Sequence, residues 1–528
     1  MKLAKSALLG SASGLIAVVG AHAADLPVKA KAVEYVKVCS LYGAGFYYIP
    51  GTDTCIKLGG YTRVETGLAT STSYDAANTS AAAAHNRLSN YFYSRSRQQL
   101  DIDTRTATEY GVVRTFFQGK FTWTSGVYTG NGANPGSTVY QALGGGGTVS
   151  PASAPQNANP GAIAGGALAM DYAFIQFAGF TMGKTVSQFA APWAGYPGNN
   201  FDGLPGGANT TNGVNQFTYT AEFGQGISAT ISAQDQVVIG TTNIWNVSLV
   251  SNSGLLGGAY GASAFGGSRS PDLVGMVRID QAWGLFQASV AAHDNHAAYF
   301  GGGPLAGTEP NGFPADKWGW AAMLALSIKN IPTGAGDLLN VQGVYTNGAS
   351  RYNFQDLMNT SYAMYGGGTG VPGVYQSLGI GGVSDAVFVN GSGMELTTTY
   401  GFRGAYTHNW DAYWNTGLYG GWGAVRYNST AKGYICGAMV ATALLSTGLA
   451  GCNPDFNYSV VGLITRWTPV KNLTFSADLA YTMLDQKYAS GSTVTQTAAN
   501  VGIAKPAATY ELKDQNSLTL LLRAQRNW

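Results

Sequence analysis

The sequence predicts an all-β protein, a transmembrane antiparallel β-barrel of sixteen strands, and three observations lead to this fold class. Apolar and polar residues alternate with a period of two over segments of about 9 to 15 residues, a suitable length for a tilted membrane-spanning strand. Beyond the first residues, no stretch reaches the roughly 18 uninterrupted apolar residues of a membrane-spanning helix. Short turns alternate with long loops rich in Gly, Ser, Thr and Asn, as in outer-membrane barrels.

Residues 1–23 have the features of a secretory signal peptide. Lys2 and Lys5 precede an apolar run over residues 7–20, and small residues at 21 and 23 predict cleavage before Ala24. We therefore expect an exported protein with a short N-terminal segment at residues 24–55 and a barrel at residues 56–528. A length of 528 residues would ordinarily suggest several domains, but no charge-rich linker or change of composition divides the chain.

The strand pattern is clearest over residues 94–110. The odd positions carry mostly Arg, Asp, Glu and Gln, whereas the even positions include Leu100, Ile102 and Tyr110. A face so rich in charge is unsuited to a protein core and fits a water-filled interior. The same alternation predicts strands that begin near residues 56, 94, 112, 171, 179, 214, 227, 272, 284, 318, 337, 395, 412, 456, 472 and 515.

Tight turns join these strands in pairs. Clear examples are the turns at residues 224–226, 281–283, 331–334, 409–411 and 468–472, while residues 125–170 and 348–394 form long loops. An even number of strands lets the last strand pair with the first, so that no strand edge is exposed to lipid.

A soluble β-sandwich is the alternative, since its strands would alternate too. Its exterior would then carry the many aromatic residues, and its strands would be unusually long. The tryptophans also favour a barrel, because they fall at strand ends, where rings meet lipid headgroups. Trp283, Trp410, Trp467 and Trp528 lie at the short-turn end, and Trp123, Trp318 and Trp422 lie toward the long loops.

The final segment, residues 517–528, alternates like the other strands and stops on Trp528. Leu518, Leu520 and Leu522 mark its lipid side, and Arg523 marks its inward side. Arg526 breaks the pattern on the lipid side, and we expect its guanidinium to reach the membrane interface.

Charge and cysteine content narrow the function. Without the two signal-peptide lysines, the 29 basic residues become 27, equal to the 27 acidic residues, which argues against a nucleic-acid partner. Cys39 with Cys55 and Cys436 with Cys452 are each sixteen positions apart, and in an exported chain they predict two local disulfides. No histidines neighbour the cysteines, so we expect neither a metal site nor a cofactor.

Five segments of the chain are distinctive: VCSLYGAGFYYIPGTDTCIKLGGYTR at 38–63, TRTATEYG at 104–111, YPGNNFDGLPGG at 196–207, WTPVKNLTFSADLAYT at 467–482 and RAQRNW at 523–528. In these segments the chain resembles the general porins of alphaproteobacteria, the rhizobial type in particular. The resemblance covers nearly all of the exported chain, although the family usually ends on Phe rather than Trp.

The resemblance implies a sixteen-stranded homotrimer in the outer membrane of a Gram-negative bacterium. Its third long loop, here about residues 190–213, would fold into the pore. Such a water-filled channel passes ions and small hydrophilic solutes by passive diffusion. In related porins a basic wall opposes acids on the inward loop. Here the candidate wall residues are Arg63, Arg95, Arg97, Arg105 and Arg114, and the loop carries one acid, Asp202. We expect weak anion preference or none.

Three other functions compete with a general porin. An outer-membrane enzyme would need a Ser-His or Asp-His set, and only His293 lies within a strand on the inward side, without a partner motif, so we expect no enzyme. A channel specific for one substrate would often stack aromatic residues along the lumen, whereas most aromatics here take the lipid face. The long loops could also act as an adhesin or phage receptor, alongside a pore function.

Overall fold

The structure of the chain is a computed structural model. It describes residues 37–70, 74, 82–87, 89, 91–124, 167–193, 195–208, 212–236, 242–301, 307–501 and 503–528. The predicted signal peptide lies outside these ranges, as does most of the predicted long loop at residues 125–170.

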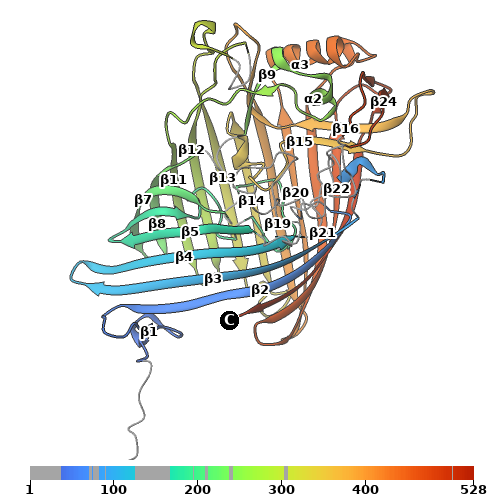
Figure 1. The fold of residues 1–528 in the computed structure, drawn as a ribbon. Coiled ribbons are helices and arrows are strands. Elements are labelled where there is room, and N and C mark those ends of the chain that lie inside the picture. The colour runs from blue at the N-terminus through green and yellow to red at the C-terminus, as the bar shows by residue number, and fades with distance from the viewer. Residues whose placement is uncertain are drawn as a thin grey trace, which may run out of the picture.

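Within the described residues, 16 antiparallel strands close into a barrel (Figure 1). They follow one another around the barrel in chain order, and the last strand closes the ring by pairing with the first along Tyr61 to Leu68. The barrel strands are β2 (Cys55–Leu68), β3 (Phe92–Thr108), β4 (Gly111–Thr124), β5 (Ala167–Phe177), β6 (Phe180–Thr185), β7 (Val214–Gly224), β8 (Ile227–Gln234), β11 (Asp272–Gln281), β12 (Gly284–Asn295), β13 (Lys317–Lys329), β14 (Leu338–Asn347), β19 (Thr398–Asn409), β20 (Trp414–Arg426), β21 (Phe456–Val470), β22 (Leu473–Gln486) and β25 (Gln515–Asn527).

The predicted sixteen strands and their closure are confirmed. The largest difference in a strand start is four residues, at β5, which begins at 167 rather than 171. The start predicted near 395 falls in a separate short strand, β18 (Glu395–Leu396), and the barrel strand β19 begins at Thr398.

Side chains alternate between the lumen and the outer face of the wall. In β3, Arg95 and Gln99 are buried on the inside, while Phe92 on the outside is 62% exposed. Aromatic rings line both ends of the outer face, as the tryptophan positions predicted. Trp414, Trp467 and Phe475 form a ladder near the short turns, with ring centroids 5.8 and 5.6 Å apart.

The long loops build an ordered cap over one end of the barrel, which the sequence pattern did not predict (Figure 1). One four-stranded sheet contains β9 (Asn243–Asn246), β10 (Ala262–Ser263), β17 (Ser384–Phe388) and β18. The other contains β15 (Ser361–Tyr365), β16 (Gln376–Gly382), β23 (Thr493–Gln496) and β24 (Ala508–Leu512). Among the described residues, the helical segments inside and outside the cap are α2 (Asn252–Leu256), α3 (Ser429–Thr442) and the 3-10 turns η1 (Ser40–Tyr42), η2 (Ala82–Ala84), η4 (Val247–Leu249), η5 (Glu309–Asn311), η6 (Ser350–Tyr352) and η7 (Leu449–Gly451).

Among the described residues, no helix has both the length and the apolar character needed to cross a membrane.

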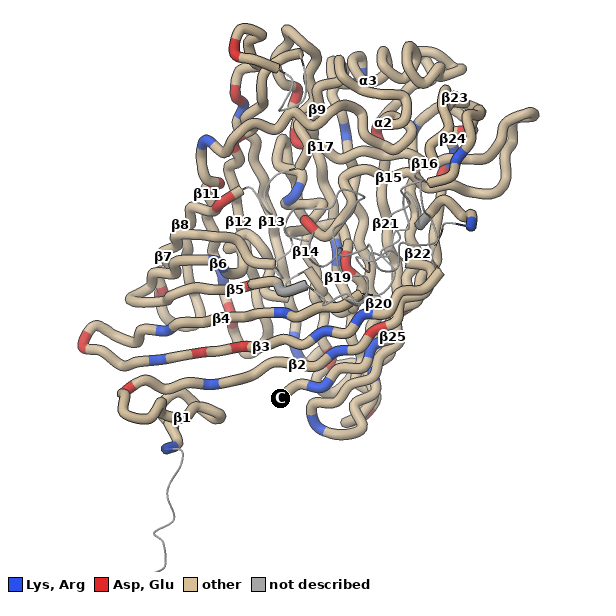
Figure 2. The backbone as a smooth tube through the Cα atoms, in the orientation of Figure 1, with Lys and Arg blue, Asp and Glu red and all other residues tan. Residues whose placement is uncertain are grey.

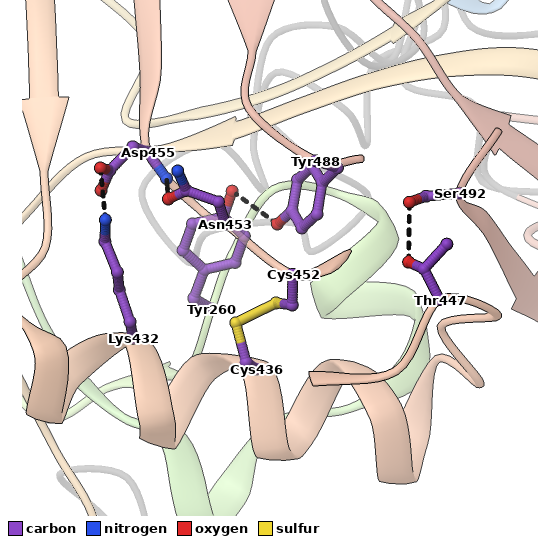
Figure 3. The surroundings of a disulfide bond; sticks show 9 residues. All are labelled: Tyr260, Lys432, Cys436, Thr447, Cys452, Asn453, Asp455, Tyr488 and Ser492. Carbon is purple, nitrogen blue, oxygen red and sulfur yellow. Dashed lines mark hydrogen bonds and ion pairs between the residues drawn. A yellow bond between two sulfur atoms is a disulfide. The ribbon is translucent and has the colours of Figure 1, made fainter. Parts of the chain in front are cut away.

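Both predicted disulfides are confirmed. Cys39 joins Cys55 beside the two-residue strand β1 (Tyr47–Tyr48), which pairs with the start of β2. Cys436 on α3 joins Cys452 just after η7 (Figure 3). In the same region, Lys432 of α3 binds Asp455 at 2.6 Å, so the disulfide and the ion pair together hold α3 against the loop that leads into β21.

The third long loop, residues 186–213, folds into the barrel, as predicted for that loop, and we call it the inward loop. Its Gly-, Pro- and Asn-rich chain forms no regular element in its described residues, so its backbone groups need partners from the wall. Gln287 on β12 donates to the carbonyl of Ala190 at 3.1 Å. Asn340 on β14 donates to the carbonyl of Pro197 at 2.7 Å.

Arg403 on β19 completes the attachment of the inward loop. It is 1% exposed, and its guanidinium donates to the carbonyls of Leu204, Gly207 and Ala208 at 2.8 to 3.3 Å. Gly206 lies so close to the wall that a Cβ there would meet the backbone of Phe402 at 2.3 Å, and its φ of +96° also favours glycine.

A second inward segment, residues 348–360, was not predicted. Asn353 accepts from the backbone N–H of Gly206 through both its carbonyl and its side chain, and Phe354 forms an isolated bridge with Gly207. Phe354 packs with lumen-facing apolar residues such as Phe456 and Val460 in the largest core cluster. The second inward segment therefore packs into the apolar part of the interior.

Candidate functional site

A polar cavity of about 560 Å³ lies inside the barrel. Its wall comes from β2, β3, β4, β5, β21, β22 and β25, and the inward loop closes its other side with residues that include Tyr196, Asn200 and Asp202. These are the strands on either side of the closing seam. The cavity thus lies between the inward loop and the strands that close the barrel.

Basic residues gather on the wall of this cavity. They are Arg63 on β2, Arg97 on β3, Lys120 on β4, Arg466 on β21 and Arg523 on β25. Figure 2 shows Lys and Arg close together on β2, β3, β4 and β25. The register accounts for part of the cluster, since Arg63 pairs directly with Arg97 across β2 and β3.

Two of these five cations have carboxylate partners. Lys120 forms an ion pair with Asp171, and Arg523 forms one with Glu65. The other three bind neutral groups in the hydrogen bonds found among the described residues. Arg63 donates to the Gln525 side chain at 2.7 Å, Arg97 to the Thr122 hydroxyl at 3.0 Å, and Arg466 to the Gly198 carbonyl at 2.7 Å.

The inward loop contributes one acid to the cavity, Asp202. Its backbone N–H donates to the carbonyl of Tyr74 at 3.0 Å, and its carboxylate accepts from the Tyr196 hydroxyl. Among the described residues that line the cavity, three arginines without a close ion-pair partner therefore share the lining with Asp202. The local charge is positive.

Asp478 on β22 holds the loop beside this acid. Its carboxylate accepts the backbone N–H groups of Asn200 and Phe201 at 2.7 and 3.2 Å and the Tyr419 hydroxyl at 2.7 Å. Arg523 donates to the carbonyl of Asn200 at 3.1 Å. Because wall side chains fix both backbone polar groups of Asn200, the loop keeps a set distance from the basic wall.

The structure brings together three of the six predicted constriction residues, Arg63, Arg97 and Asp202. Arg95 is 5% exposed, pairs with Glu65 and lies over the Tyr74 ring at 3.8 Å, so it lies outside the lining.

Arg105 and Arg114 share the Asp103 carboxylate, each at 3.0 Å, near the short turn between β3 and β4 and outside the cavity.

Lys120, Asp171 and Arg466 line the cavity but were not among the predicted residues. Strand parity could have placed Lys120 and Arg466 inward, because Arg466 shares the parity of Ile464, which is fully buried on the inside. Asp171 could not be placed by parity, because a β-bulge shifts the register of β5 beside it.

His293, the inward histidine of β12, is 1% exposed. Its Nδ1 lies 2.8 Å from Asp272, and its Nε2 lies 3.8 Å from Asp385. Tyr352 of the second inward segment donates to the same Asp272 carboxylate at 2.5 Å. The histidine therefore helps to tie the second inward segment to the wall.

Comparisons with known proteins agree with the barrel fold. A family model described as the porin subfamily matches residues 25–521. The porin Omp2b of Brucella suis is 30% identical over 300 residues, and that of Brucella canis is 31% identical over 302 residues. Each alignment covers 55% of this chain and 66% of the relative, slightly less than two thirds of its length.

The outer membrane channel DcaP of Acinetobacter baumannii has a similar fold. The TM-score is 0.54, and the match covers 91% of this chain and 99% of that chain. At 12% sequence identity, the likeness concerns the fold alone.

Proposed function

The chain belongs to the porin subfamily, and from this premise we propose that it forms a water-filled channel in the outer membrane for passive diffusion of ions and small hydrophilic solutes. The observation that carries the proposal is the polar cavity between the basic wall and the inward loop, inside a closed barrel. Charged and amide side chains there can replace part of the hydration shell of a passing solute.

The proposed constriction is formed by Arg63, Arg97 and Arg466 on the wall and Asp202 on the inward loop. Lys120 and Arg523 add charge that is largely compensated by Asp171 and Glu65. Because the cations in the lining outnumber the acids by five to two, the local potential favours anions. This supports a weak anion preference.

Electrical recording in planar lipid bilayers tests both statements. We expect a stable ohmic conductance. In a salt gradient, the sign of the reversal potential should indicate that anions pass more readily than cations. Liposome swelling should show that small sugars enter and that entry slows as the sugar grows. Absence of conductance from correctly folded protein contradicts the channel, and strong cation selectivity contradicts the constriction.

An enzymatic function has less support. The family assignment favours a channel, and the nitrogens of His293 face the carboxylates of Asp272 and Asp385 rather than a nucleophile. Sugar leakage without any hydrolysis of phospholipid or peptide separates the two classes.

We also propose a homotrimer, which rests on the family resemblance and on the outer face of β2, β3 and β4. That face carries Thr62, Ser94, Ser96, Gln98, Thr104 and Thr115, and Thr62 donates to the Gln98 side chain there. Hydroxyl and amide groups are poorly solvated by lipid, and a neighbouring copy can cover them. Native mass measurement after mild detergent extraction should give three times the chain mass, whereas a monomer contradicts the proposal.

A further inference from the structure

Arg526 lies on the outer face of the barrel, where the strand pattern calls for an apolar residue. On β25 it pairs with Thr62 of β2 on one side and with Leu473 of β22 on the other. The preceding outward residues of β25, Leu522 and Ala524, are apolar. The exposed guanidinium is therefore directed toward the membrane at the end of the barrel that carries the short turns.

The contacts of Arg526 leave most of its donors free. It donates to the backbone carbonyl of Lys471 in the turn between β21 and β22. That bond uses one of the five N–H donors of a guanidinium. Among the described residues, neither Arg526 nor Lys471 takes part in an ion pair within 4.0 Å. In the adjacent turn, the Asp411 carboxylate accepts the backbone N–H groups of Tyr413 and Trp414.

A groove of about 470 Å³ lies on the outer wall at Leu522 and Ala524, the outward residues that precede Arg526 on β25. Small residues form its floor, among them Ala524, Ala477 and Thr66. Ala524 pairs with Val64 on one side and with Phe475 on the other, so larger side chains flank it. The volume is within the range of small-molecule sites, roughly 300 to 1,000 Å³.

The aromatic ladder of Trp414, Trp467 and Phe475 borders the same groove. Rings of this kind lie at the depth where lipid headgroups meet acyl chains. Arg526 follows Ala524 by two residues on the same face, a rise of about 6.6 Å along the strand. The cation thus lies at the headgroup end of the groove, and the apolar floor extends toward the membrane interior.

We propose that Arg526, Lys471 and this groove bind one anionic phospholipid of the membrane leaflet on the short-turn side. The phosphate accepts hydrogen bonds from the guanidinium and is held near the Lys471 ammonium, and an acyl chain lies over Ala524 and Ala477 against Phe475. Two cations without a carboxylate partner select an anionic headgroup over a zwitterionic one. The proposal is independent of the channel function, because every residue in it faces outward.

Tryptophan quenching by brominated lipids tests this site in the full-length folded protein. The protein is placed in phosphatidylcholine vesicles that contain a small, equal fraction of either dibromo-phosphatidylglycerol or dibromo-phosphatidylcholine. We expect stronger quenching by the anionic lipid, since bromine atoms near the groove lie against Trp414 and Trp467. Equal quenching by the two lipids overturns the proposal, including the case in which a second copy of the chain covers the groove.

Two variants test separately whether lipid binding needs the charge of Arg526 and the open floor of the groove. Arg526→Gln keeps a donor for the Lys471 carbonyl but removes the charge, and it should abolish the excess quenching. Ala524→Phe fills the floor of the groove without changing the charge, and it should also abolish the excess quenching by the anionic lipid. The control for loss of one positive charge is Lys329→Gln at the end of β13, where the residue has lumen-side parity and lies 3.6 Å from Asp280, and it should keep the excess quenching.

Three results with the variants contradict the proposal. The excess quenching by the anionic lipid persists in Arg526→Gln, it persists in Ala524→Phe, or it is lost in Lys329→Gln to the same extent as in Arg526→Gln. Soluble glycerol phosphate should not displace the lipid, and displacement would mean that free phosphate is the ligand. If Arg526→Gln does not fold, as judged by circular dichroism, Lys471→Gln measures the charge effect instead and should reduce the excess.

Discussion

Glu65 lies where the first and last strands of the barrel meet. Its carboxylate is 1% exposed and binds Arg95 of β3 on one side and Arg523 of β25 on the other. Both arginines are direct register partners of Glu65, so one side chain connects three adjacent strands across the closing seam. Removing the carboxylate leaves the buried Arg95 and the cavity-lining Arg523 without their ion-pair partner, which costs more than the original pairs contribute.

Glu65→Gln should therefore lower the free energy of unfolding by about 3 to 5 kcal/mol. Denaturant unfolding of the folded protein in detergent measures the change. Glu222→Gln is the matched control, because Glu222 is an exposed residue of β7, and a change there should stay within about 0.5 kcal/mol. Equal effects of the two substitutions would mean that the seam does not depend on the ion pairs.

The charge of Arg97 should influence ion selectivity. Arg97→Gln removes one of the three arginines without an acidic partner, so the reversal potential in a salt gradient should shift toward cations. Arg114→Gln is the same chemical change at a residue bound to Asp103 outside the cavity, and it should leave selectivity nearly unchanged. A shift of equal size in Arg114→Gln would place the selective region nearer the short turns.

At the scale of elements, the two ends of the barrel are stabilised differently. The short turn between β13 and β14 is held by the buried Asp337, whose carboxylate accepts from the Thr333 hydroxyl, the Asn409 backbone N–H, His408 and the Tyr406 hydroxyl at 2.7 to 2.9 Å. Burial by itself would raise the pKa of Asp337, but these hydrogen bonds outweigh it and hold that pKa well below its usual range.

This depressed pKa predicts a loss of stability in acid. The ionised Asp337 carboxylate contributes to the free energy of unfolding. This contribution is fully present above the unfolded-state pKa of about 3.9 and falls as the pH drops toward the lower folded-state pKa. Asp337→Asn should therefore be less stable than the parent at neutral pH, and the difference should shrink below about pH 4. Denaturant unfolding of both proteins between pH 6 and pH 3 measures this difference in stability. Asp280→Asn, at an exposed residue near the end of β11, should differ from the parent by the same small amount at every pH.

At the capped end, the Cys436–Cys452 disulfide holds α3. Replacing both cysteines with serine releases a constraint worth about 3 kcal/mol for a loop of this length. Because the strand pairing of the barrel does not involve α3, we expect local opening rather than unfolding of the barrel. Trypsin should cut faster after Lys432, while the thermal transition of the β-structure stays unchanged. A fall of that transition by several degrees would contradict the separation of cap and barrel.

At the scale of the whole molecule, the sequence was sufficient for the barrel and only partly sufficient for the site. The alternation of charged and apolar residues in β3 specifies which face meets water, because lipid and lumen impose opposite preferences on neighbouring residues. Parity alone placed Arg63 and Arg97 inward. It could not separate them from Arg105, since depth along the lumen depends on where the inward loop is attached.

The cap was missed because its strands are short and pair over long sequence distances. Residues 376–382 are glycine-rich and resemble a loop in sequence, yet β16 lies in parallel beside β24. β9 likewise pairs in parallel with β17, which follows it by more than a hundred residues. No local period identifies such strands, since their burial arises from contacts among separate loops.

These parallel pairings in the cap also have a consequence for folding kinetics. Strands from distant loops meet only after loop closure over long chain segments, which is slow, whereas neighbouring barrel strands join through tight hairpins. Refolding should therefore show an early rise in β-structure and a later phase in the environment of Trp245, which is 1% exposed and lies 5.3 Å from the Tyr260 ring. Trp245→Phe should remove the late fluorescence phase and leave the early phase intact. A single shared rate would mean that barrel and cap form in one cooperative step.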